Sequence, residues 1–212
     1  YVNHPATGKR LVRNQECNMG NLVADAMRKV LNSDIGIING GNIRKDIPKG
    51  VFTYKDILEV LPFGNSCAVK ELSGQQILDA LEMGARNLPR ETGSFLHVSG
   101  LTYEVDASKP STVVLNEKGA FVKVGGTYRV HNVRVAGKPL DLGKLYSVAT
   151  ITYLLEKNGD GMTMLKNGKV LFIDENMTDA EIVIEYIQNH LNARVGEEYA
   201  NTFGEGRITI KY

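Results

Sequence analysis

The stretch Asp34-Ile-Gly-Ile-Ile-Asn-Gly-Gly-Asn-Ile-Arg44 (DIGIINGGNIR) carries the pattern that decides the fold. Residues 34–38 form a short apolar run of strand length, and Asn39-Gly40-Gly41 then indicates a turn. Upstream, residues 18–30 place apolar side chains at helical spacing, with Asn18 as the expected N-cap. The stretch therefore predicts a helix, then a buried strand that ends in a glycine-rich turn.

Further helix patterns occur early and late in the chain, whereas strand patterns dominate the second half. This order favours a single α+β or mixed α/β domain over residues 1–212, with a mixed β-sheet flanked by helices, over a doubly wound parallel fold. In chain order we expect a helix at 53–61, a strand at 66–72, a helix from residue 73, strands within 95–151, a helix at 178–191 and a strand at 207–211.

The composition excludes several classes of protein. A hydrophobic share of 42% over 212 residues supports a substantial core. The 25 basic and 24 acidic residues almost cancel, so no global field attracts nucleic acid or a membrane surface. No apolar run is long enough to be a transmembrane segment.

Tyr1 follows no charged-then-apolar leader, so either a signal peptide has been removed or the chain is an excised domain.

Cysteine and histidine are too scattered to form a metal site. Cys17 and Cys67 lie fifty residues apart, which fits neither a metal-ligand spacing nor a disulfide framework. We interpret them as two small, partly buried apolar residues. The four histidines have no His-x-x-x-His or Asp-x-His partner. We therefore expect no metal or cofactor to be bound by this chain.

The turn Asn39–Arg44 is the first candidate for a binding loop. Glycines such as Gly41 let a ligand approach the backbone closely. Arg44 offers a planar fork that suits phosphate or carboxylate, and Asn39 can both donate and accept, as a base edge requires. The alternative is a plain turn with a solvated arginine, and short glycine motifs alone do not exclude it.

Three more loops combine glycine or a helix start with a chemically useful side chain. Phe63, between Pro62 and Gly64, is either a stacking platform for a base or a core residue at a helix end. Asp160 lies between two glycines and is either a ligand for ribose hydroxyls or part of a hairpin turn. Arg13, ahead of a helix N-terminus, is either an anion ligand or an ordinary surface arginine.

Taken in order, these loops are far more specific than any one of them. The ordered set resembles the C-terminal domain of the 5'-nucleotidase family, which includes UDP-sugar hydrolases and 2',3'-cyclic-nucleotide phosphodiesterases. The resemblance covers about residues 10–165. It rests on Glu16-Cys-Asn-Met-Gly-Asn-Leu22, Ile38-Asn-Gly-Gly-Asn-Ile-Arg44, Leu61-Pro-Phe-Gly-Asn65, Val98-Ser-Gly100 and Asn158-Gly-Asp-Gly161.

The resemblance implies an enzyme of two domains. An N-terminal calcineurin-like phosphoesterase domain would carry two divalent metal ions and a His–Asp pair, and the C-terminal domain would recognise the nucleoside. This chain would then bind a nucleotide and partner that N-terminal domain, and would be inactive alone. Family members are mostly exported, so the resemblance implies a periplasmic, secreted or cell-surface location.

The same resemblance implies roles for individual residues. Phe63 matches the first stacking aromatic and Asn39 the residue that meets the base. Asp160 matches the carboxylate on the ribose hydroxyls. Arg44 and Arg13 match the arginines around ribose and phosphate. Gly41 completes the expected substrate-binding set through its place in the glycine turn.

Two departures from the family pattern concern the base site. The second stacking aromatic is matched by Leu154, one residue from Tyr153, and we predict that Tyr153 supplies the second face. Asn42 stands where the family more often has glycine, which adds a side chain beside the ligand.

Two rival functions are a non-catalytic nucleoside- or nucleotide-binding module and a structural domain that binds nothing. A nucleic-acid binder is disfavoured because the chain has no basic stripe.

Overall fold

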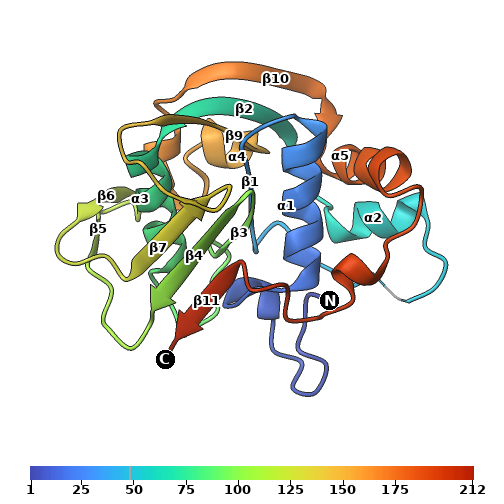
Figure 1. Ribbon diagram of the computed structural model, residues 1–212, viewed down its shortest axis with the longest axis horizontal. Helices are drawn as coiled ribbons and strands as arrows, with labels where there is room; N and C mark the ends of the chain where they lie inside the picture. The colour runs from blue at the N-terminus through green and yellow to red at the C-terminus, as the bar shows by residue number, and fades with distance from the viewer. Residues whose placement is uncertain (48) are drawn as a thin grey trace.

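The computed structural model describes residues 1–47 and 49–212 and is built around a five-stranded mixed sheet (Figure 1). Its interior strand β1 (Ile35–Asn39) is fully buried and pairs parallel with the central strand β9 (Leu145–Ile151) and antiparallel with the edge strand β3 (Leu96–Ser99). β2 (Ser66–Ser73) lies between β9 and the edge strand β10 (Lys169–Thr178), antiparallel to both. The predicted mixed α/β class is confirmed.

The remaining strands are divided over two smaller sheets in the described part of the chain. The sequence indicated these strands but not their separation from the main sheet. One sheet has the order β11 (Ile208–Lys211), β4 (Leu101–Asp106), β7 (Val130–Val135) and β8 (Lys138–Pro139), and the other pairs β5 (Val113–Leu115) with β6 (Phe121–Val124).

The helices begin at side chains that satisfy their first backbone N–H groups. Thr53, Ser73 and Thr178 each form a capping box, and all three lie at helix starts that the sequence predicted. The helices are α1 (Asn18–Val30), α2 (Tyr54–Val60), α3 (Gly74–Ala85), α4 (Thr152–Leu155) and α5 (Asp179–Glu185), which a π-helical turn (Tyr186–His190) continues.

The prediction of Asn18 as an N-cap was wrong by one residue. Cys17 has the extended N-cap conformation, and its Sγ accepts from the Gly20 N–H at 3.4 Å. Asn18 is instead the first helical residue, and its side-chain amide donates to the Tyr199 carbonyl at 2.8 Å. The Asn18 side chain therefore bonds to the distant loop at Tyr199 instead of capping the N-terminus of α1.

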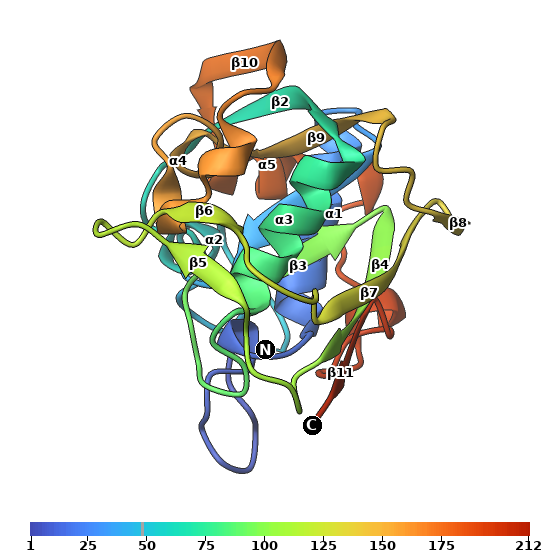
Figure 2. The ribbon, with the colours of Figure 1, turned by 90° about the vertical axis from the view of Figure 1, so that its left-hand side faces the viewer.

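The five-stranded sheet has two different faces: α1 and α3 lie on opposite sides of it in Figure 1, and Figure 2 is seen from the side of α3. We call the side of α1 the helix face. Gly36 faces α1 so closely that an added Cβ would lie 2.2 Å from the Ala24 carbonyl oxygen. We call the other side the loop face, because α3 shares it with the segment 152–166. Asn39 and Lys70 both contact that segment.

The core is continuous through the main sheet and the helices that cover it. Val23, Met27, Ile38 and Leu81 are fully buried, and each such side chain contributes about 1.5–3 kcal/mol through burial of apolar area. This packing fixes the ends of β1 and β9, from which the site loops extend. Among the described helices, none combines the length and apolarity needed to cross a membrane.

Candidate functional site

A cavity of about 520 Å³ opens where β1 ends on the loop face. Its walls come from segments that are far apart in the sequence, and all seven predicted site residues line it. The lining residues are Arg13, Asn39, Gly41, Asn42, Arg44, Phe63, Asn65, Gly93, Tyr153 and Asp160.

The glycine turn after β1 brings three segments together. Gly40 donates to the Phe95 carbonyl at 2.7 Å and Gly41 to the Gly93 carbonyl at 2.8 Å. An added Cβ on Gly40 would lie 1.8 Å from the Val12 carbonyl oxygen, so this position has no space for a side chain. Close packing of the turn therefore places Arg13, the next residue along, at the wall of the cavity.

Asp160 is held at the cavity by two side chains and by its own backbone. Asn39 Nδ2 donates to Asp160 Oδ2 at 2.7 Å, and the Tyr153 hydroxyl lies 3.3 Å from Oδ1. The Asp160 N–H donates to the same hydroxyl at 3.2 Å. The residue is left-handed at φ 53° within the turn Gly159–Gly161. This turn lies between α4 and the 3-10 turn Thr163–Leu165 and joins no pair of strands, so the hairpin alternative is wrong. A carboxylate accepts several hydrogen bonds, so Asp160 retains capacity for ligand hydroxyls.

Asn39 lies at the back of the cavity rather than at its mouth. It is only 3% exposed, and because a carboxylate accepts but does not donate, the amide nitrogen must face Asp160. Its Oδ1 is then left without a hydrogen-bond partner in the described structure. Asn39 thus orients Asp160 and offers one acceptor, whereas the sequence predicted contact with a base.

The two predicted aromatic residues both reach the cavity. Phe63 is 58% exposed, which excludes the alternative of a core residue, and the Arg44 guanidinium carbon lies 5.8 Å from its ring centroid. Tyr153 is half-buried, and burial together with the charge of Asp160 raises the pKa of its hydroxyl. Leu154 is fully buried in the core. Of the two neighbouring positions, only Tyr153 is therefore available to a ligand.

Two arginines give the cavity a positive wall. Burial lowers the pKa of Arg13, and the nearby charges of Arg10 and Arg44 lower it further. Within the described ranges the Arg13 guanidinium has no ion-pair partner, whereas Arg10 is bonded to Glu91 at 2.7 Å. Arg13 and Arg44 together can therefore hold a planar anion through charge-assisted hydrogen bonds.

An amide network closes the cavity on the side of α5. Asn42 Nδ2 donates to Asp179 Oδ2 at 2.7 Å, and Asn65 Nδ2 donates to Asn42 Oδ1 at 2.9 Å. Burial raises the pKa of Asp179. Asn42 and Asn65 therefore both line the cavity, and both polar atoms of the Asn42 amide are already bonded, one to Asp179 and one to Asn65. The sequence placed Asn65 in a motif without giving it a role, and no pattern indicated Gly93.

No set of three or more His, Cys, Asp or Glu side chains within residues 1–47 and 49–212 is placed to hold a metal ion. Cys17 and Cys67 are free and fully buried, and burial raises the pKa of both thiols. The donor groups of this chain therefore do not fit a two-metal centre.

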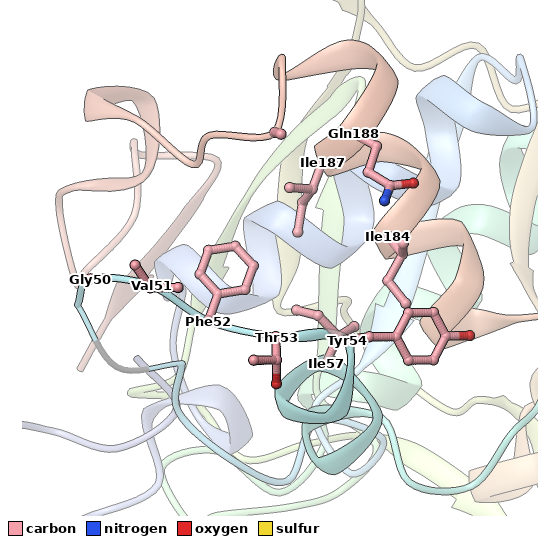
Figure 3. Close-up of a pocket in the computed structure, with 10 residues that line it drawn as sticks. Gly50, Val51, Phe52, Thr53, Tyr54, Ile57, Ile184, Ile187 and Gln188 are labelled. Atoms are coloured by element: carbon pink, nitrogen blue, oxygen red, sulfur yellow. The ribbon is translucent and has the colours of Figure 1, made fainter.

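A second cavity of about 360 Å³ lies between the start of α2 and the π-helical turn, and its chemistry is different (Figure 3). Phe52 and Ile187 point toward each other across it. Tyr54, Ile57 and Ile184 supply much of the remaining wall, and none of the described lining residues is charged. This lining therefore offers no cation to pair with a phosphate.

The cavity combines arginines with aromatic side chains, a lining suited to an anionic aromatic ligand. Comparison with known protein families identifies the family of the domain. Residues 3–167 match the model for the "5'-nucleotidase, C-terminal domain". The chain therefore belongs to the 5'-nucleotidase family, as a member of its C-terminal domain.

Relatives and solved structures agree with this assignment. The chain is similar to the 5'-nucleotidase of Diplobatis ommata (34% identity, covering 83% of the chain and 31% of the relative). It is also similar to that of Vibrio parahaemolyticus (28% identity, 88% and 29%). The crystal structure of the 5'-nucleotidase precursor from Thermus thermophilus matches with a TM-score of 0.71 and 36% identity, covering 94% of this chain and 36% of that one. The chain thus spans about a third of the length of these proteins.

Proposed function

We propose that residues 1–212 form the substrate-recognition domain of a 5'-nucleotidase-type metallophosphoesterase that hydrolyses phosphate esters of nucleotides. The observation that carries this proposal is the convergence of Arg13, Asn39, Phe63, Tyr153 and Asp160 on one cavity from four separate parts of the chain. The names of the relatives supply the nucleotide as the ligand class.

Each wall of the cavity has a part in this proposal. Phe63 and Tyr153 take the base between them, since base–aromatic stacking contributes about 1–3 kcal/mol for each base. The Asp160 carboxylate accepts hydrogen bonds from the ribose hydroxyls, while Asn39 holds that carboxylate in position. Arg44 and Arg13 bind the phosphate, and Gly41 lets the ligand approach the backbone.

In this proposal, hydrolysis depends on metal-binding groups outside the described residues of this chain. We propose that an N-terminal metallophosphoesterase domain holds two divalent ions, which activate water and neutralise charge on the phosphate. The chain alone would bind and orient the nucleotide without cleaving it, and hydrolysis of AMP by the purified, metal-free chain would contradict this. We further propose a periplasmic, secreted or cell-surface location, as the family resemblance implies.

The test is a calorimetric titration of the 212-residue chain with adenosine and with AMP in the absence of metal. We expect saturable micromolar to millimolar binding, because one stacked base and a few hydrogen bonds must offset the entropy of association. Phe63→Ala should weaken binding by about 1–3 kcal/mol through loss of stacking. Asp160→Ala should weaken it as well.

Phe52→Ala is the matched control, since it removes the same side chain from the apolar cavity of Figure 3. It should leave adenosine affinity unchanged. Equal losses in Phe52→Ala and Phe63→Ala, or no heat at millimolar adenosine, would contradict the proposed site.

A further inference from the structure

Lys70 is a buried cation that the proposed function does not use. It lies in the middle of β2, opposite Val148 on β9 and Val170 on β10, and is 1% exposed. Burying an ammonium group costs several kcal/mol unless it is well paired. The apolar neighbours of this strand would accept a valine or leucine, so a lysine here requires a specific set of partners.

Its three partners all belong to the segment that carries Asp160. Lys70 Nζ donates to the Leu155 carbonyl at 3.1 Å and to the Lys166 carbonyl at 2.7 Å, and lies 2.8 Å from Glu156 Oε1. An ammonium group has three N–H donors, so these contacts use all of them. Leu155 ends α4 and Lys166 follows the turn Thr163–Leu165. One buried ammonium group therefore joins both ends of the segment 156–165.

The conformation of this segment needs such support. Asn158 and Asp160 are both left-handed, at φ 52° and 53°, a conformation that only glycine adopts freely and that asparagine and aspartate adopt as single residues with local hydrogen bonds. Further along, Gln76 donates to the Met164 carbonyl and Thr163 to the Phe121 carbonyl, both at 2.8 Å. These contacts hold the second half of the segment, whereas Lys70 also holds its beginning.

We propose that Lys70 is a positioning residue of the binding site, which keeps the 156–165 segment in the shape that presents Asp160 to ribose hydroxyls. Lys70 touches no ligand itself. Its effect on affinity rests on the proposed function of Asp160, but its effect on the segment does not. The consequence for specificity is that Lys70 favours ribonucleosides over nucleosides that lack the 2' and 3' hydroxyls.

Hydrogen exchange of the whole chain tests the hold on the segment without any ligand. Lys70→Met keeps an unbranched side chain of nearly the same length but removes its donors, and Lys169→Met is the control at an exposed lysine on the neighbouring strand. We expect amides of 156–165 to exchange about tenfold faster in Lys70→Met, as loss of hydrogen bonds to a charged group predicts. Amides of α1 should not change.

Glu156→Gln provides a second variant should Lys70→Met fail to fold, because Glu156 is partly exposed and the amide retains an acceptor. It should accelerate exchange of the same segment to a smaller extent. Unchanged exchange across 156–165 in Glu156→Gln and in folded Lys70→Met would overturn the proposal.

Titration with adenosine and 2',3'-dideoxyadenosine then separates positioning from general stability. Lys70→Met should weaken adenosine binding about tenfold and dideoxyadenosine binding less than about twofold. In an Asp160→Ala background it should have no further effect on adenosine. Equal weakening of both ligands would overturn the positioning role. If the unmodified chain bound neither ligand, the proposed function would fail, and the exchange result would still decide whether Lys70 holds the segment.

Discussion

The helix face and the loop face of the main sheet treat their charged groups in opposite ways. On the helix face, Asp25 accepts from Arg207 at 2.7 and 2.8 Å, from Ser99 at 2.5 Å and from Tyr199 at 2.8 Å. On the loop face, Asp160 and Arg13 are oriented by neighbours but open to a cavity. The polar groups of the helix face therefore bond to one another and stabilise the fold, whereas those of the loop face remain available for a ligand.

The residues that stabilise the fold and the residues that could bind a ligand therefore lie on different faces of the same sheet. Burial opposes ionisation of Asp25, but the hydrogen bonds and charge of Arg207 more than offset it and lower the pKa of that carboxyl. No described residue neutralises Arg13 in this way, and its pKa is lowered by burial and by two other arginines. Substitutions on the helix face should therefore change stability, and substitutions on the loop face should change affinity.

The largest effect is expected for Asp25→Ala. Removing one member of a buried ion pair leaves Arg207 without its main partner, which costs about 3–5 kcal/mol. Urea denaturation at neutral pH measures this loss. Under conditions where the variant is folded, adenosine affinity should be unchanged, and a parallel loss of affinity would break the separation of the two faces.

Acid should destabilise the helix face through His97. Burial lowers the pKa of this histidine from 6.5 to about 4, and its Nε2 lies 2.9 Å from the Val12 carbonyl oxygen. The unfolded chain takes up a proton near pH 6.5 and the folded chain only near pH 4. The free energy of unfolding should therefore fall by about 3 kcal/mol as the pH drops through this window.

Urea denaturation at several pH values measures this slope. His97→Gln should flatten it, since glutamine can still donate to Val12 but does not titrate. The exposed His190→Gln should retain it. A slope of the same size in His97→Gln would assign the acid sensitivity to another group.

The smallest effect is expected on the loop face, for Arg13→Ala. AMP binding should weaken about tenfold, the loss typical of a hydrogen bond to a charged group, whereas adenosine binding should change less than about twofold. Arg10→Ala removes the same charge from a residue that is bonded to Glu91 and does not line the cavity. Calorimetry with both ligands measures the difference, and equal effects of the two substitutions would argue against a phosphate contact at Arg13.

Local patterns predicted much of the fold and of the cavity. The run before Asn39 became the buried interior strand β1, and the helix starts at Thr53 and Ser73 follow from capping residues next to apolar periodicity. Loops that follow strands of one sheet meet at its edge, so Asn39 and Asp160 came together although 121 residues separate them. The order of the motifs along the chain predicted the cavity because each motif loop extends from a helix or strand with a fixed place in the fold.

Features that depend on distant contacts were not predictable. Lys70 sits in an alternating strand and bonds to carbonyl groups 85 and 96 residues away, so no local pattern marks it. The edge strand β10 was missed although Val170-Leu-Phe-Ile173 is an apolar run typical of a strand. The bond between Asn39 and Asp160, which gives Asn39 a supporting role toward the carboxylate that the sequence did not indicate, likewise needed the tertiary structure.

The most direct test of the central claim is a map of backbone amide shifts in the labelled 212-residue chain as adenosine is added. The separation of faces predicts saturable changes at 39–44, 61–65 and 153–161, with α1 and the apolar cavity of Figure 3 unaffected. Shifts centred on α1 or on that second cavity, or none at millimolar adenosine, would contradict the assignment of the loop face as the nucleoside site.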